Sequence, residues 1–272
     1  MAVYHIPTVY LLIGILYLLL PLMVWFVLFD QPSRMKSLWC VAGELFGLGL
    51  IMVGLRAHLP VWVSYTFANA VMWTAVFIQT VALQRALDQR LTLKWVALLV
   101  AVCLSVFEFF RLIQQDAVLR FTWSMLIFVS VFCFNAFLCW RIASVHQLKS
   151  ARWLSAVYAI TAATMSLRAL RVVLGVTEPD IVAQGVDSAL TVVPGLLIAV
   201  IGNFAFIGMF LERSTKGQIK EAAERVRQEE SARLGEQIAQ LERQRTLGAM
   251  SASFAHELSQ PLTAILMDEI GR

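Results

Sequence analysis

The sequence predicts an all-α fold, in which a bundle of seven transmembrane helices is followed by a charged helix. Three observations carry this prediction. The 272-residue chain is 59% hydrophobic and 15% charged, with a mean hydropathy of +0.73, which lies far outside the range of soluble domains. Its apolar residues form seven stretches of membrane-spanning length. After the seventh stretch the composition changes abruptly to alternating charges of both signs.

The seven apolar stretches define a membrane region over residues 1–211. They run from Thr8 to Phe29, Leu38 to Leu55, Val61 to Leu83, Lys94 to Ile113, Phe121 to Trp140, Trp153 to Gly175 and Ser188 to Leu211. Short connections between them favour antiparallel neighbours in a compact helical bundle. No basic segment precedes the first stretch and no cleavage site comes after it, so we expect it to be retained rather than removed as a signal peptide.

The basic residues predict the orientation of this region in the membrane. Most of them lie in the first, third and fifth connections or at their edges, namely Arg34, Lys36, Arg85, Arg90, Lys94, Arg141, Lys149 and Arg152. The sixth connection instead carries Glu178, Asp180 and Asp187. Because basic loops stay on the cytoplasmic side, we expect the N-terminus outside and the C-terminus in the cytoplasm.

Charged residues inside membrane spans are costly and are therefore candidates for function. The candidates for an intramembrane polar network are Glu44, Glu108, Arg111, Arg168 and Arg171. At about 1.5 Å per residue, Glu108 and Arg168 lie at similar depth, which predicts an ion pair between them. Asp187 is close enough in sequence to pair with Arg171, whereas Glu44 has no evident partner. Such a network is either a sensory polar pocket or a set of structural contacts between helices.

The segment from 212 to 246 has the pattern of a helix that joins the membrane region to the C-terminal residues. Its sparse apolar residues recur at steps near three and four, with one break, at Ile219, Ala223, Val226, Leu234, Ile238 and Leu241. This pattern predicts a cytoplasmic two-stranded coiled coil with a stutter, about 50 Å long if it is fully helical. The alternative is a single solvated helix. The apolar seam continues to Leu247, which favours a dimer.

Residues 247–272 contain a polar island that reads Phe-Ala-His-Glu-Leu-Ser-Gln-Pro-Leu from Phe254 to Leu262. On a helical wheel, Leu247, Phe254 and Leu258 lie on one side. His256 lies on the opposite side, among small and polar residues where a partner can reach it. The alternative is a surface helix on which this histidine is merely solvated.

These residues resemble the phosphoacceptor box of bacterial sensor histidine kinases, in the subgroup with the run His-Glu-Leu-x-Gln-Pro-Leu. The resemblance covers only the last stretch of the chain, from about Leu247. It implies that 247–272 is the first helix of a histidine-phosphotransfer hairpin, which dimerises as a four-helix bundle. It further implies that His256 accepts the γ-phosphoryl group of ATP and passes it to an aspartate of a response regulator. The expected location is the bacterial inner membrane.

The residue types of the box suit this chemistry. Imidazole is nucleophilic near neutral pH because its ordinary pKa is about 6.5. Glu257 is placed to hold the other ring N–H or to accept the proton. The resemblance gives Gln260 the task of orienting water when the regulator is dephosphorylated. Pro261 cannot donate a backbone hydrogen bond, which predicts a bend in the helix, the alternative being that the helix ends there.

The expected cofactors and partners are those that this resemblance implies. A complete kinase uses ATP and Mg²⁺, but neither a second hairpin helix nor an ATP-binding domain is recognisable here. We therefore expect no autophosphorylation unless an ATP-binding domain acts in cis or in trans. The other expected partners are a second copy of the chain, a response regulator and the lipid bilayer, with no nucleic acid.

Other cofactors are not predicted. The four cysteines show no metal-binding spacing, no histidine pair faces across the spans to hold haem, and the seventh stretch has no lysine for retinal. A different class of function stays open, namely a non-enzymatic seven-span receptor or a transporter with a dimerising C-terminal helix. A transporter would be expected to show an inverted repeat with broken helices, and no convincing repeat is present.

Overall fold

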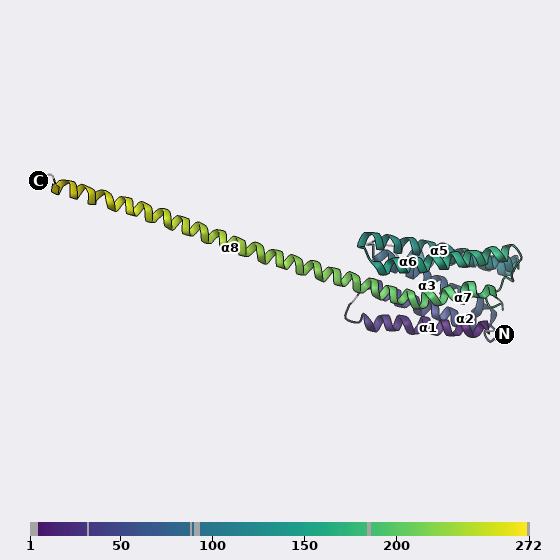
Figure 1. The fold of residues 1–272 in the computed structure, drawn as a ribbon. Helices are drawn as coiled ribbons and strands as arrows, with labels where there is room; N and C mark the ends of the chain where they lie inside the picture. The colour runs from purple at the N-terminus through teal and green to yellow at the C-terminus, as the bar shows by residue number, and fades with distance from the viewer. Residues whose placement is uncertain (1–4, 32, 88, 90–92, 184–185, 271–272) are drawn as a thin grey trace. The chain divides into compact units, whose positions relative to one another are not determined.

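The computed structural model describes residues 5–31, 33–87, 89, 93–183 and 186–270, with the backbone alone for Leu93, Val186, Ala249 and 252–270. The chain divides into two compact units, Met1–Arg213 and Ser214–Arg272. Every regular element of the described residues is helical (Figure 1), so the predicted all-α class is confirmed.

Within the described residues, seven helical segments are long and apolar enough to cross a membrane, as the sequence predicts. The first two are α1 (Ile6–Val27) and α2 (Arg34–Gly54). The next four are η1 (Trp62–Phe67) with α3 (Ala68–Arg85), α4 (Leu93–Glu108) with η2 (Phe109–Ile113), α5 (Ala117–His146) and α6 (Lys149–Val173). The short 3₁₀ turn η3 (Val186–Ser188) leads into the last, made of α7 (Ala189–Leu197), η4 (Ile198–Gly202) and the start of α8 (Asn203–Ile270). These segments are compatible with a multi-pass membrane protein.

The ends of α5 are defined by its capping residues rather than by hydropathy. α5 extends beyond the apolar stretch Phe121–Trp140 at both ends. At its start, the side chain of Asp116 accepts a hydrogen bond from the backbone N–H of Leu119 at 2.9 Å. At its end, Gln147 adopts the left-handed conformation with φ of 51°, which terminates the helix.

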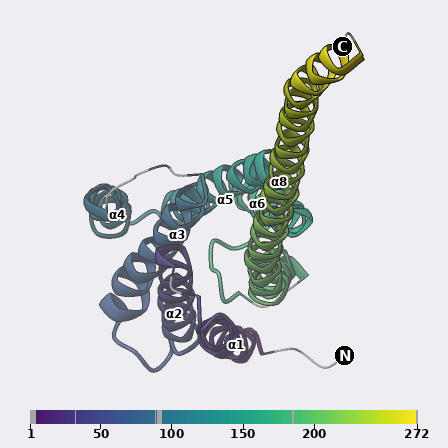
Figure 2. The same ribbon diagram turned by 90° about the vertical axis from the view of Figure 1, so that its left-hand side faces the viewer.

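Six of the seven segments form a closed ring in the unit Met1–Arg213. The contacts run from α1 to α2, α3, α5, α6 and α7, and η4 packs back against α1. α4 lies outside this ring, against α3 and the edge of α5 (Figure 2). Only 11% of its most apolar window is buried, and Trp95 and Val102 are more than half exposed. This apolar face suits contact with lipid.

Aromatic side chains fill the interior of the ring. Phe46 of α2 lies with its ring centroid 4.9 Å from Tyr17 of α1 and 6.3 Å from Phe128 of α5. The series continues from Phe128 to Phe132 at 6.1 Å and from Phe132 to Tyr158 of α6 at 5.9 Å. Such offset and tilted pairs add to the stabilisation from packing, so four helices share one aromatic core.

Three of the segments contain π-helical turns, in which the backbone hydrogen bond skips one residue more than in an α-helix. The turn in the seventh segment, η4, comes after Pro194, which lacks a backbone donor. Just after η4, Asn203 donates to the carbonyl of Ala199 at 2.7 Å and accepts from the indole of Trp39 at 3.0 Å. The Trp39 ring stacks on Phe206 at 4.3 Å. These contacts hold the start of α8 against α2.

The backbone of α8 is helical from Asn203 to Ile270, through both His256 and Pro261. The alternative that the helix ends at Pro261 is therefore wrong. Along 214–248, six apolar side chains remain 54–64% exposed, namely those of Ile219, Val226, Leu234, Ile238, Leu241 and Leu247. The predicted coiled coil stays a prediction, and its seam is uncovered in the single chain.

Candidate functional site

The predicted functional residues fall into two groups. His256, Glu257, Gln260 and Pro261 belong to the helical backbone of α8, but their side chains lie outside the described residues. The second group is the intramembrane network, whose members are described. Most of its polar contacts gather where the second, fourth and sixth connections meet, which we call the Asp180 end of the bundle. The opposite end, with the first, third and fifth connections, is the Glu212 end.

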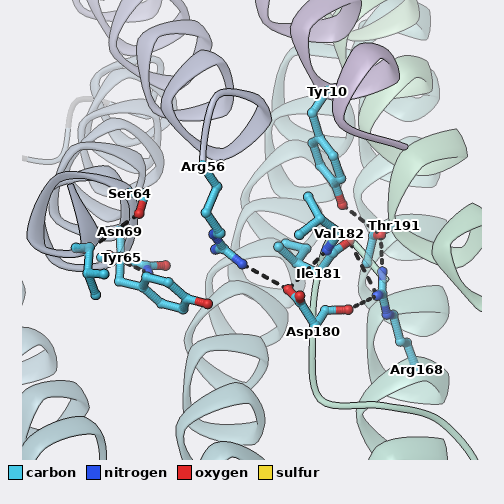
Figure 3. Close-up of polar contacts among 11 residues, drawn as sticks. Tyr10, Arg56, Ser64, Tyr65, Asn69, Arg168, Asp180, Ile181, Val182 and Thr191 are labelled. Carbon is cyan, nitrogen blue, oxygen red and sulfur yellow. Dashed lines mark hydrogen bonds and ion pairs between the residues drawn. The ribbon is translucent and has the colours of Figure 1, made fainter. Parts of the chain in front are cut away.

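Arg168 of α6 is the most deeply buried charge in the described residues, at 2% exposure. Figure 3 shows its polar contacts. Its guanidinium group donates to the hydroxyl of Thr191 and, at 2.8 Å, to the backbone carbonyl of Asp180. It also lies over the ring of Phe121, with 5.5 Å between Cζ and the ring centroid. Within the described chain no carboxylate forms an ion pair with it. Its charge is stabilised by oxygen dipoles, as a buried polar group requires.

The predicted ion pair between Arg168 and Glu108 is wrong. Glu108 pairs instead with Arg111 of the same segment, at 2.6 Å between Nη2 and Oε2, and accepts a hydrogen bond from Thr66 at 2.6 Å. Glu108 lies on α4, which packs outside the ring against α3, whereas α6 lies beyond α5. The partner three residues away satisfies the carboxylate without crossing the bundle.

The hydroxyl of Thr191 joins three helices at this end (Figure 3). It donates to the carbonyl of Ser188 at 3.0 Å and accepts from Arg168, and it lies 3.1 Å from the hydroxyl of Tyr10. Since its single proton is used, Tyr10 is the donor in the last contact. Thr191 therefore connects α1, α6 and α7.

Asp180, in the sixth connection, joins this cluster to the connection that follows α2 (Figure 3). Its carboxylate accepts from Arg56 at 2.8 Å and from the backbone N–H of Val182 at 3.2 Å. The Cζ atoms of Arg56 and Arg120 lie 4.0 and 4.9 Å from the ring centroid of Tyr65, within the range of cation–π attraction. A small cavity of about 40 Å³ adjoins these side chains, which is room for a few waters at most.

The cluster therefore has an excess of positive charge. Arg56, Arg120 and Arg168 contribute three guanidinium groups, and among the described residues only Asp180 forms an ion pair with any of them. The nearby guanidinium group of Arg171 does not add to this excess, because it forms its own ion pair. The predicted pair between Arg171 and Asp187 is confirmed at 2.7 Å.

Two further observations concern the predicted network. Glu44 lies apart from the Asp180 end on α2, and its Oε1 atom is buried without a hydrogen-bond partner in the described part of the chain.

Conversely, the sequence did not single out Tyr10, Arg56 or Thr191 as site residues. Asp180 was seen only as a loop charge, and it contributes to the site partly through its backbone carbonyl, which leaves no trace in a sequence.

The Glu212 end contains one contact that joins α6 to α8. The carboxylate of Glu212 accepts from the backbone N–H groups of Lys149 and Ser150 at 2.8 and 3.2 Å and from the Ser150 hydroxyl at 2.5 Å. It thereby caps the N-terminus of α6, whose N-cap residue Leu148 has no capping side chain. α6 thus contributes Arg168 to one end of the bundle and anchors α8 at the other.

We expect Arg56 and Asp180 to be coupled by about 1 kcal/mol, the upper range for a partly exposed pair. Their side chains are 17% and 43% exposed, so solvent weakens the attraction. Thermal unfolding of Arg56→Gln, Asp180→Asn and the double variant in detergent measures this coupling. Arg120→Gln combined with Asp180→Asn is the matched control and should be additive. If the changes in unfolding free energy are additive in both double variants, Asp180 does not link the cluster to the connection after α2.

Comparisons with known proteins give no relatives: no family model, curated protein or solved structure matches this chain.

Proposed function

We propose that this chain is the membrane-sensor and phosphoacceptor part of a bacterial sensor histidine kinase. The box around His256 is the observation that carries the proposal. The helical backbone of α8 supports it, because one helix begins in the seventh apolar segment and continues through the box. A change in the membrane bundle thus has a continuous element through which to reach the acceptor histidine.

In the proposed reaction, the unprotonated ring nitrogen of His256 attacks the γ-phosphorus of ATP. The N–P bond forms as the bond from phosphorus to the bridging oxygen breaks, and ADP leaves. The proton on the other ring nitrogen is held or accepted by Glu257. The phosphoryl group then passes to a carboxylate oxygen of the response regulator as the N–P bond breaks. Any proton accepted by Glu257 returns to the ring, which restores the neutral imidazole. ATP, with its Mg²⁺, is held by an ATP-binding domain in cis or in trans.

The Asp180 end is the proposed input site, facing outside, with the Glu212 end in the cytoplasm. The concentration of basic residues in the first, third and fifth connections supports this orientation. The excess of guanidinium groups at the Asp180 end favours an anionic stimulus. An anion that competes with Asp180 for Arg56 would release the sixth connection, which is bonded to the second connection and to α6.

Dimerisation is part of the proposal. The six apolar side chains along 214–248 are exposed in the single chain, and their spacing suits burial against the same seam of a second copy. Exposed charges on the remaining faces keep such a coiled coil soluble.

The test supplies the ATP-binding domain of a kinase with the same box, together with γ-labelled ATP, to the purified chain in detergent. We expect label that is lost in acid and retained in base, as a phosphoramidate on histidine requires. The supplied domain must first label its own acceptor helix, which shows that it is competent. Absence of label on this chain, or label that resists acid, contradicts the proposal.

A further inference from the structure

A cavity of about 390 Å³ opens at the Glu212 end, between the ends of α2, α3, α5 and the start of α8. Three arginines line it, namely Arg34, Arg85 and Arg213. Its floor is apolar and includes Met35, Met209 and Phe210. The cavity therefore combines concentrated positive charge with an apolar surface.

No carboxylate among the described residues neutralises the three arginines. No carboxylate of the described residues lines the cavity or forms an ion pair with any of the three. The Nε atom of Arg85 is buried without a hydrogen-bond partner in the described chain, and Arg213 reaches only the carbonyl of Ala86, at 3.5 Å. A buried donor without a partner costs free energy. Guanidinium groups match the oxygen geometry of phosphate, so the site is complementary to a phosphate group.

A second cavity of about 400 Å³ extends this site along the side of the bundle. It shares Ser33 and Arg34 with the first and is also lined by Trp25, Phe29 and Lys36. The Phe29 side chain is 68% exposed. Lys36 donates to the carbonyl of Leu28 at 2.7 Å and lies 4.9 Å from the centroid of the Trp25 ring. Together the cavities lead from a cationic site at the helix ends to exposed apolar and aromatic surface.

We propose that this pair of cavities binds an anionic phospholipid. The phosphate lies among Arg34, Arg85 and Arg213, and an acyl chain runs along Trp25 and Phe29. Basic pockets between membrane helices on the cytoplasmic side are where anionic head groups bind. A free phosphate ion would use the arginines but would leave the apolar floor and the second cavity unfilled. The proposal concerns binding by the membrane bundle and does not depend on phosphotransfer by His256.

The site also bears on α8, because Met209, Phe210 and Arg213 belong to that helix. A bound head group would join Arg213 to Arg34 and Arg85, and so tie the start of α8 to α2 and α3. Glu212, the neighbouring residue, already ties it to α6. Lipid composition would thereby influence how firmly α8 is held.

The test measures lipid retained by the full chain after purification in detergent containing equal amounts of phosphatidylglycerol and phosphatidylcholine, read by native mass spectrometry. We expect preferential retention of phosphatidylglycerol. The preference should fall about fivefold for each arginine removed in Arg34→Gln, Arg213→Gln and the double variant. Arg34 and Arg213 are exposed, so these variants should fold, and Arg85→Gln extends the series to the partly buried member.

Arg152→Gln is the matched control, because it removes the same charge from the same end of the bundle without lining the cavity. It should keep the preference. Equal loss in the control would show attraction to surface charge alone and overturn the proposal. Absence of any preference in the unaltered chain would also overturn it. So would displacement of the lipid by millimolar inorganic phosphate, since that result identifies a soluble anion as the occupant.

Discussion

Replacing His256 with glutamine is expected to abolish phosphate transfer to this chain. Glutamine keeps a polar side chain that suits a solvated helix position, but its amide nitrogen is not nucleophilic because its lone pair is delocalised into the carbonyl. Without the nucleophile the phosphoryl transfer cannot occur, however well ATP is bound and oriented. With a competent ATP-binding domain and labelled ATP, the acid-labile signal should fall to background.

His58→Gln is the control for this experiment. His58 is an exposed histidine in the connection after α2, so its replacement tests whether any accessible imidazole acquires label. Labelling should equal that of the unaltered chain. If His256→Gln retains the acid-labile signal while folding normally, the acceptor lies elsewhere and the resemblance of the box is misleading.

Replacing Glu212 with alanine is expected to release α8 from α6. The carboxylate caps two backbone N–H groups and one hydroxyl at the start of α6, and loss of such a cap costs about 1–2 kcal/mol. Free energy of that size changes an equilibrium between signalling states about five- to thirtyfold. We expect a change of this order in the rate of His256 phosphorylation. Hydrogen exchange at the amides of Lys149 and Ser150 should accelerate as well.

Two further variants make the Glu212 result specific. Ser150→Ala removes the 2.5 Å hydroxyl contact and leaves the backbone contacts, so it should have a smaller effect in the same direction. Glu221→Ala removes an equal charge from an exposed position on the same helix and should change neither measurement. Unchanged amide exchange in Glu212→Ala would show that this contact does not hold the two helices together.

Hydropathy was sufficient to predict the helices because each membrane-spanning helix is recognisable from the apolar residues of its own segment. It could not predict how the helices are ordered around the ring. Glu108 and Arg168 illustrate this: their depths were estimated from the chain, but the peripheral position of α4 separates them. Arg171 and Asp187 were paired correctly because the connection between α6 and α7 keeps them close.

The centre of the candidate site was missed for a different reason. Arg168 is satisfied by a backbone carbonyl and a threonine hydroxyl, and neither differs in sequence from many other carbonyls and hydroxyls along the chain. For the phosphoacceptor box, the sequence is informative and the structure is not. Its residue pattern is highly informative, whereas the side chains of His256, Glu257 and Gln260 lie outside the described residues, so their roles stay predictions.

The π-helical turn η4 has a consequence for how the seventh segment can change shape. Five residues, Ile198–Gly202, are wound more loosely than an α-helix. Conversion of this turn to α-helix would wind them more tightly and rotate the subsequent residues about the helix axis. Phe206 would then move away from Trp39, and Glu212 away from the start of α6. Conversion of η4 is thus one route by which the seventh segment would rotate the start of α8.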